Sequence, residues 1–445
     1  MRSEFKYWNH LPYQIGHKAE VKVHPVPEMM NFASVDALIR ELKPRVPVHC
    51  IRPQVLQQVA EWFLANFPGD VLYAVKCNPE PAVLHHLSAA GIRHFDVTSL
   101  SEIKMISKFA PGGTAYFMHP VKSRDAIRKA YFDYGVRDFA LDSKDELQKI
   151  IEETGSATDL NLHIRLALPK GVAAHDLSGK FGAHPDLTVE LLQAADKIAR
   201  QVGICFHVGS QCLHPDAYRR AIKLAAQVIS KSGVEIDVLN LGGGFPAVYP
   251  GMTPPPMSRF MDAIKAGLAE DIKLPAHTKV RCEPGRALVA EAGSVVVNVE
   301  LRKGDNLYIN DGVYGSLFDA GILNMRYPAK LIRGNGSEHK APYKGFKLYG
   351  PTCDTVDSMR GPYLLPEDTT EGDWIELGQL GAYCTTMRSK FNGFDEHMTV
   401  EVWDQPQMQM KDWQPRTDRR TMDKDNVTTL NLIAWEREAY ETEMS

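Results

Sequence analysis

The sequence lacks a strong charge of either sign. Its 445 residues carry 51 basic and 55 acidic side chains, for a formal net charge of −4. A chain this close to neutral has no electrostatic reason to bind nucleic acid or an anionic membrane surface, so we expect neither partner. The 44% of hydrophobic residues also excludes a mostly disordered chain, because there is ample apolar material to bury.

Paired cysteines and long apolar runs are absent as well. The seven cysteines are widely spaced and form no C-x-x-C pair, which argues against a secreted disulfide scaffold. The first ten residues lack the apolar run of a signal peptide, and no stretch approaches the ~20 apolar residues that span a bilayer. These absences predict a soluble, cytoplasmic protein, and the length suggests about two or three domains.

From Val71 to Arg286, short β-rich runs alternate with segments that have the helical spacing of apolar residues. Eight such runs occur, among them VLYAVK, HFDVTS and KVRCEPGR. This rhythm is typical of a (β/α)8 barrel, although an open doubly wound sheet could produce it too. Nearly every run has a polar or glycine cluster at its carboxyl end, where barrel enzymes place their chemistry, so the sequence favours the barrel.

The pattern changes after Arg286. Alternating and β-branched residues are broken there by a Lys-Gly-Asp turn, which predicts antiparallel strands. We therefore expect an α/β protein with four regions. They are an N-terminal segment (1–45) that packs with the β domain, a barrel (46–286), a mostly antiparallel β domain (287–402) and a peripheral tail (403–445) that ends in a short helix.

Several strand ends of the predicted barrel carry residues suited to chemistry. Lys76 ends an apolar run. It could simply reach solvent, but a lysine in an apolar barrel mouth has a lowered pKa and can form a Schiff base. The loop LGGGFP exposes backbone N–H groups that can surround a phosphate, to which Arg286 can also bind. With Glu283 as the partner of a cation, this set describes a pocket for pyridoxal 5′-phosphate.

Ten motifs follow one another over about residues 70–395. They are YAVKCN, FDVTSLSEI, DS at Asp142, KFGA at Lys180, HVGSQC, LGGGFP, EPGR, NDGVYGS, GPTCDTVD and GAY…FNGF. In this set and order, the chain resembles the fold-type III, pyridoxal 5′-phosphate-dependent decarboxylases of ornithine, lysine, arginine and diaminopimelate. Within that family it is most similar to ornithine decarboxylase of the eukaryotic type. The family has an alanine racemase-like barrel followed by a β domain.

The resemblance implies a role for each matching barrel residue. Lys76 would bind the cofactor covalently. Glu283 would keep the pyridine nitrogen protonated, which favours decarboxylation over racemisation. His207 would stack on the ring, unless it is an ordinary core histidine. The phosphate would be held by Ser210, Gly244, Gly285, Arg286 and Tyr383, with Asp96 and Arg165 as supporting residues. The alternative for Tyr383 is a core tyrosine with a bonded hydroxyl.

The motif GPTCD extends the resemblance into the β domain. Cys353 is either a small buried hydrophobe or, as the resemblance implies, the acid that protonates the carbon that has lost CO2. Asp354 would bind the distal ammonium of the substrate. In relatives both residues reach the pocket from the other subunit, so the resemblance implies a homodimer with shared active sites. It implies no metal.

One departure from the family leaves the substrate open. The Tyr-Asp pair that usually follows YGSF is missing from YGSLFDAGILNMRYP. Asp319 is the candidate for this second substrate contact, and Asn324 is a weaker one.

We expect decarboxylation of L-ornithine to putrescine, with lysine or both amino acids as the alternative. Arginine and diaminopimelate suit Asp354 less well. A different alternative is a regulatory homologue without activity, similar to the antizyme inhibitors. Such proteins tend to lose cofactor contacts, whereas this chain keeps Lys76, Glu283, Arg286 and Cys353.

Overall fold

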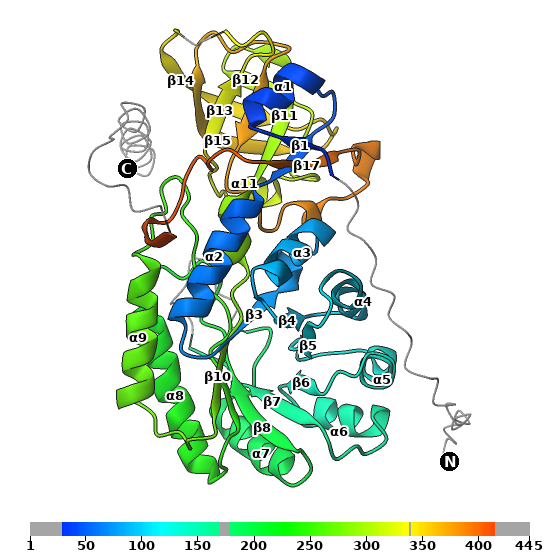
Figure 1. Ribbon diagram of the computed structural model, residues 1–445, viewed down its shortest axis with the longest axis vertical. Coiled ribbons are helices and arrows are strands. Elements are labelled where there is room, and N and C mark those ends of the chain that lie inside the picture. Colours follow the sequence, from blue (N-terminus) through cyan, green and yellow to red (C-terminus); the bar gives the residue numbers. More distant parts are fainter. Residues whose placement is uncertain (1–28, 170–178, 338–339, 414–445) are drawn as a thin grey trace.

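The computed structural model describes residues 29–169, 179–337 and 340–413. Parallel strands β3 to β10 close into a barrel, and a helix follows each strand. In Figure 1 the barrel forms the lower part of the molecule and a second sheet the upper part. The prediction of a closed barrel followed by a β domain is therefore confirmed.

The barrel strands correspond to the eight β-rich runs of the sequence. They are β3 (Asp70–Ala74), β4 (His94–Val97), β5 (Thr114–Phe117), β6 (Asp138–Leu141), β7 (Asn161–Arg165), β8 (Gln201–Cys205), β9 (Val238–Asn240) and β10 (Lys279–Cys282). The helices that follow them are α3 (Pro81–Ala89), α4 (Leu100–Phe109), α5 (Arg124–Phe132), α6 (Lys144–Glu153), α7 (Pro185–Asp196), α8 (Asp216–Ser232), α9 (Met257–Glu270) and the short α10 (Arg286–Val289). Helix α2 (Pro53–Asn66) precedes the first strand.

Local sequence explains the short loops at the carboxyl ends of these strands. Helices α4, α5 and α6 each begin at a serine N-cap, namely Ser99, Ser123 and Ser143, whose hydroxyl accepts a hydrogen bond from a backbone N–H of the first turn. Each cap lies within a few residues of the end of the preceding strand, so the loops that surround the barrel mouth are short here.

The second domain is a nine-stranded sheet, with order β1-β17-β2-β11-β12-β14-β15 and with β13 and β16 paired beside β11. Its strands are β1 (Asn31–Phe32), β2 (Val48–Ile51), β11 (Gly293–Lys303), β12 (Asn306–Ile309), β13 (Ala329–Ile332), β14 (Tyr343–Tyr349), β15 (Ser358–Pro366), β16 (Trp374–Leu377) and β17 (Met398–Val402). Helices α1 (Val35–Leu42) and α11 (Phe318–Ile322) complete it. Most pairings are antiparallel, but β1–β17, β17–β2 and β12–β14 are parallel.

Two segments lie elsewhere than the sequence predicts. Strand β2 falls within the range predicted for the barrel but pairs with β11 and β17 of the sheet. Residues 403–413, predicted to belong to the peripheral tail, end in the buried Trp413, whose indole packs against Trp62 and Phe63 of α2. The predicted terminal helix and most of the N-terminal segment lie outside the described residues.

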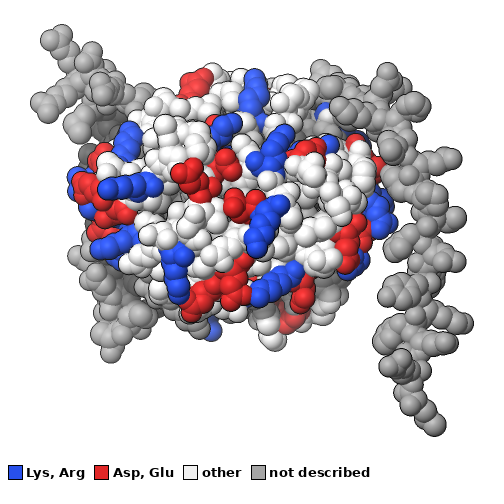
Figure 2. Space-filling model, turned by 90° about the horizontal axis from the view of Figure 1, so that it is seen from below, with Lys and Arg blue, Asp and Glu red and all other residues white. Residues whose placement is uncertain are grey.

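None of the helices in the described part of the chain has the length and apolarity that a bilayer crossing requires. On the face seen from below in Figure 2, Lys and Arg side chains intermingle with Asp and Glu. This face therefore has no extended patch of one sign, in keeping with the near-neutral composition.

Candidate active site

The predicted barrel residues come together because of the barrel topology. Lys76 lies in the 3-10 turn after β3, Asp96 in β4 and Arg165 at the end of β7. His207 follows β8, the glycine loop Gly242–Gly244 follows β9, and Glu283 follows β10. The carboxyl ends of parallel barrel strands meet at one mouth, so these side chains share it.

Lys76 and Asp96 form an ion pair at this mouth, with 2.6 Å between Nζ and Oδ2. Burial is the largest single cause and acts to lower the pKa of Lys76, but Asp96 and, to a smaller extent, Tyr383, Cys77 and Glu283 together outweigh it, and the pKa lies above its ordinary value. The apolar run around Lys76 predicts a lowered pKa instead. The difference arises because the strand beside β3 brings a carboxylate to the amine.

Glu283 is buried among charges of both signs. Burial is the main cause that raises its pKa to about 7, and Asp96 adds to it. Lys76, Arg165 and a hydrogen bond from Asn240 act in the opposite direction. The carboxyl group is therefore poised between its two protonation states and needs a cationic partner to stay ionised at neutral pH.

His207 lies against the glycine loop. Its Nδ1 accepts a hydrogen bond from the backbone N–H of Gly209 at 3.0 Å. A Cβ atom on Gly243 would lie 2.9 Å from His207 Nε2, so only glycine lets the loop approach the ring this closely. Burial, together with Arg165 and Lys76, lowers the pKa of His207, and the ring is neutral at pH 7.

Arg286 is held by aromatic and acidic neighbours. It donates to the Tyr249 hydroxyl at 2.9 Å, pairs with Asp319 at 3.4 Å, and lies 4.8 Å from the centre of the Tyr383 ring. Its Nε is buried and has no hydrogen-bond partner among the described residues. A guanidinium with an unused buried donor suits an anion that the polypeptide itself does not supply.

Two glycines of the predicted phosphate site have neighbouring chain segments packed closely against them. Gly244 has φ +107°, and a Cβ there would lie 2.5 Å from the carbonyl oxygen of Gly209, next to Ser210. A Cβ on Gly285 would lie 2.2 Å from Cys77 Sγ. Tyr383 has φ +55°, and its N–H donates to Cys77 O at 2.9 Å. Only glycine at positions 244 and 285 allows these close contacts.

Cys353 and Asp354 lie in the β domain, between β14 and β15. The backbone N and the Sγ of Cys353 are 3.2 and 3.3 Å from Asn392 Oδ1. Asp354 accepts hydrogen bonds from the Tyr314 hydroxyl and the Val356 N–H, and the Tyr314 bond is the first cause that lowers its pKa. Among the described residues, no hydrogen bond or ion pair joins either side chain to the barrel mouth.

Asp319 is the candidate for a second substrate contact, but in the structure it lies beside Arg286 of the same chain. Its carboxylate is buried and pairs with Arg286. Asn324 is exposed, with φ +53°. Asn240 and Tyr249 contact Glu283 and Arg286, and the motifs do not single them out.

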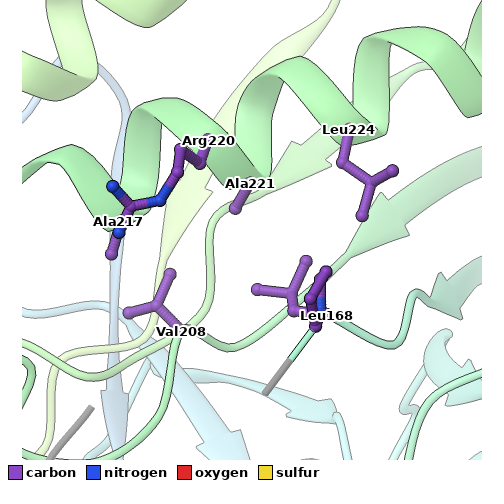
Figure 3. Close-up of a pocket in the computed structure, with 7 residues that line it drawn as sticks. Leu168, Val208, Ala217, Arg220, Ala221 and Leu224 are labelled. Carbon is purple, nitrogen blue, oxygen red and sulfur yellow. The ribbon is translucent and has the colours of Figure 1, made fainter. Parts of the chain in front are cut away.

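A separate cavity of about 350 Å³ lies beside the site, between α8 and the segments that follow β7 and β8 (Figure 3). Its lining is apolar except for Arg220 of α8, and it reaches Val208, the neighbour of His207. None of the predicted site residues lines it.

The family match covers helix α2 and the barrel. Residues 52–290 match the family described as pyridoxal-dependent decarboxylase, pyridoxal binding domain. A lysine/ornithine decarboxylase of Selenomonas ruminantium is 30% identical over 391 residues, which cover 85% of this chain and 96% of that protein. An ornithine decarboxylase of Schizosaccharomyces pombe is 32% identical and covers 76% of this chain and 79% of its own.

Two further relatives differ in what they do. Antizyme inhibitor 2 of Xenopus laevis is 32% identical, with 82% of each chain covered. A crystal structure of lysine/ornithine decarboxylase from Vibrio vulnificus, complexed with cadaverine, superposes with a TM-score of 0.71 at 28% identity, covering 83% of this chain and 98% of that one.

Proposed function

Because this chain belongs to the family of fold-type III, pyridoxal 5′-phosphate-dependent decarboxylases of basic amino acids, we propose that it converts L-ornithine to putrescine and CO2. The observation that carries the proposal is the array of Lys76, Glu283 and Arg286 at one barrel mouth. The array offers an amine, a carboxyl group beside cationic neighbours and an arginine with an unused donor.

Each group of the cofactor has partners in this array. When bound, pyridoxal 5′-phosphate supplies a protonated ring that accepts the electrons left behind as CO2 departs. Arg286, with Ser210, Gly244, Gly285 and Tyr383, would hold the phosphate. Lys76 would hold the aldehyde carbon, with Asp96 and Arg165 as supporting residues.

Glu283 and His207 would act on the ring. The Glu283 carboxylate holds a proton at the ring nitrogen, since a nearby negative charge favours the cationic form. The neutral His207 imidazole offers a flat face without a competing charge. A carboxylate in this place supports decarboxylation rather than racemisation, because it strengthens the electron-accepting power of the ring.

We propose that Cys353 and Asp354 complete the site of a second copy of the chain, in a homodimer with shared active sites. The support is their position on an exposed part of the β domain, beside the exposed apolar side chains of Val356, Phe391 and Phe394. The Cys353 thiol would give its proton to the carbon that has lost CO2. Asp354 would bind the distal ammonium of the substrate, because an unpaired ammonium in a partly dry pocket is unfavourable.

A cytoplasmic location is part of the same proposal. All seven cysteines are free, six of them buried, which suits a reducing compartment.

The choice of ornithine rests on Asp354 and on the motifs shared with ornithine decarboxylases. Lysine, or both amino acids, is the alternative, favoured by the lysine/ornithine decarboxylases among the relatives. One methylene separates the two substrates and is worth only ~1–3 kcal/mol in a pocket. A regulatory role without catalysis is the second candidate, favoured by the similarity to antizyme inhibitor 2.

The test is CO2 release from ornithine, lysine, arginine and diaminopimelate by the purified protein with pyridoxal 5′-phosphate. We expect the highest kcat/KM with ornithine and measurable turnover of lysine. A preference for arginine or diaminopimelate would overturn the substrate proposal. Ornithine selectivity above ~1000-fold would mean that a residue other than Asp354 sets the substrate length, since one methylene cannot supply it.

A further inference from the structure

Asn240, the last residue of β9, has a fully buried side chain with two partners. Its Nδ2 donates a hydrogen bond to Glu283 Oε1 at 2.7 Å. Its Oδ1 accepts one from the backbone N–H of Gly242 at 2.9 Å. One side chain thus joins the glycine loop after β9 to the carboxyl group after β10.

The direction of these two bonds follows from the chemistry of the groups. A backbone N–H can only donate, so the amide oxygen of Asn240 faces Gly242 and the NH2 group faces Glu283. The Gly242 backbone is itself confined: it has φ +65°, and a Cβ atom there would lie only 1.9 Å from the carbonyl oxygen of Phe206. Asn240 therefore ties the position of Glu283 to a rigid part of the barrel mouth.

We propose that Asn240 is a positioning residue, whose amide group keeps the Glu283 carboxylate ionised and aimed at the cofactor ring. The inference rests on the proposed function for the role of Glu283. It explains why an amide suits this position: an amide can donate to a carboxylate and accept from Gly242 without adding a charge to the site.

The surroundings of Glu283 make this donor important. Asp96 on β4 and burial both favour the protonated carboxyl group. Lys76 after β3, Arg165 on β7 and Asn240 favour the carboxylate. Of these three, Asn240 is the one within hydrogen-bond distance. Its loss leaves Glu283 without a direct donor from the described residues and shifts the balance toward the neutral acid.

Asn240→Ala tests the proposal in the holoenzyme. We expect kcat to fall about ten- to a hundred-fold with KM within about two-fold, because the Asn240 side chain is fully buried and its amide bonds to Glu283 and Gly242. We also expect the acid limb of the pH profile to move to higher pH, since Glu283 then needs a higher pH to ionise. The pH titration of the visible absorbance of the bound cofactor should shift in the same direction.

Asn240→Asp distinguishes the effect of the lost hydrogen-bond donor from the effect of a smaller side chain. This variant keeps the acceptor for Gly242 but can donate to Glu283 only while it carries a proton. Its kcat should recover where the two carboxyl groups share one proton and should fall as the pH rises. Recovery at every pH, or at none, would contradict a role as donor.

Asn161→Ala is the matched control. Asn161 is a buried asparagine of the same barrel, and it donates to the Asp138 carboxylate at 2.9 Å, but at the amino ends of β6 and β7. It should lower stability without moving either pH profile. The proposal is overturned if Asn240→Ala keeps the wild-type kcat and profiles, or if Asn161→Ala shifts them equally. If the wild type binds cofactor but releases no CO2, the proposed function fails, while the absorbance titration still tests Asn240.

Discussion

Two carboxylates near the expected substrate path have different partners. Asp354 is bound by neutral groups, the Tyr314 hydroxyl and the Val356 N–H, so its charge is available to an external cation. Asp319 already has a cationic partner, Arg286, at 3.4 Å. Asp354→Ala should therefore raise KM for ornithine about ten- to a hundred-fold, the effect of one lost charge-assisted contact, with an unchanged cofactor spectrum. Steady-state kinetics and absorbance measure both.

Asp319→Ala is the control for that experiment. Because its carboxylate faces Arg286, its removal should leave KM for ornithine within about two-fold of the wild type. An equal rise in KM for both variants would show that Asp319 binds substrate after all.

Glu283 should make the cofactor-free protein sensitive to pH. Its folded pKa of about 7 lies above the ordinary 4.5, so ionisation destabilises the fold as the pH rises from about 4.5 to 7, and the loss is complete above 7. Glu283→Gln removes this loss. The variant should be more stable than the wild type at pH 8, on the order of 1–3 kcal/mol, and similar at pH 5.

Chemical denaturation of both cofactor-free proteins at the two pH values measures this difference. The stability difference between Glu283→Gln and the wild type should be larger at pH 8 than at pH 5. Equal differences at the two pH values would contradict a raised pKa of Glu283 in the folded protein.

The sequence motifs identify single residues of the site, but not the residues that contact them. Lys76, Glu283 and Arg286 end or follow apolar runs, and topology alone brings them together. Asn240 lies 43 residues from Glu283, and Tyr249 lies 37 from Arg286. No local pattern signals such contacts, because they depend on which strands become neighbours.

Among the helices, α9 has an N-terminal cap that comes from far along the chain. Pro256, its N-cap residue, makes no side-chain cap hydrogen bond. Instead, Asp412 accepts from the N–H groups of Met257 and Ser258 at 2.7 and 2.9 Å. Asp412→Ala should lower the free energy of unfolding by about 0.5–2 kcal/mol, as for other lost caps. Asp412→Asn should keep only part of this stability, because its amide has one acceptor oxygen for the two N–H groups.

Urea denaturation tests this cap. Equal stabilities of the alanine variant and the wild type would mean that residues 403–413 do not stabilise α9. The contact also explains why the sequence misplaces this segment in the tail: its polar residues suggest exposure, but Asp412 and Trp413 find partners on the barrel. Trp413 Nε1 donates to the buried Glu291 at 2.7 Å.

Strand β2 illustrates a similar limit. All four of its residues are buried, so it has no alternation that could indicate which sheet it joins. Its pairing with β11 and β17 follows from tertiary packing.

At the scale of the molecule, a buried cluster joins the two domains. Arg52, at the start of α2, donates to Ser294 and Glu376 of the sheet and to Asp404 at 3.0, 2.8 and 2.9 Å. The sheet that carries Cys353 is thus firmly attached to its own barrel. The proposed homodimer therefore treats the barrel and the sheet of each copy as one unit.

Mixing inactive variants tests this sharing. Lys76→Ala combined with Cys353→Ala should restore about a quarter of the sites, since half of randomly paired dimers are mixed and each has one intact site of two. Lys76→Ala combined with Arg286→Ala should restore none, because both lesions lie in the barrel. No recovery in the first mixture, with subunit exchange verified, would contradict shared sites.

The proposed decarboxylation is tested by the stoichiometry of the reaction in the purified protein with pyridoxal 5′-phosphate. We expect one CO2 and one putrescine for each L-ornithine consumed, and neither product from Lys76→Ala, which should also lose the visible absorbance of the bound cofactor. Cofactor binding without CO2 from any basic amino acid, or full activity in Lys76→Ala, would contradict decarboxylation at this site.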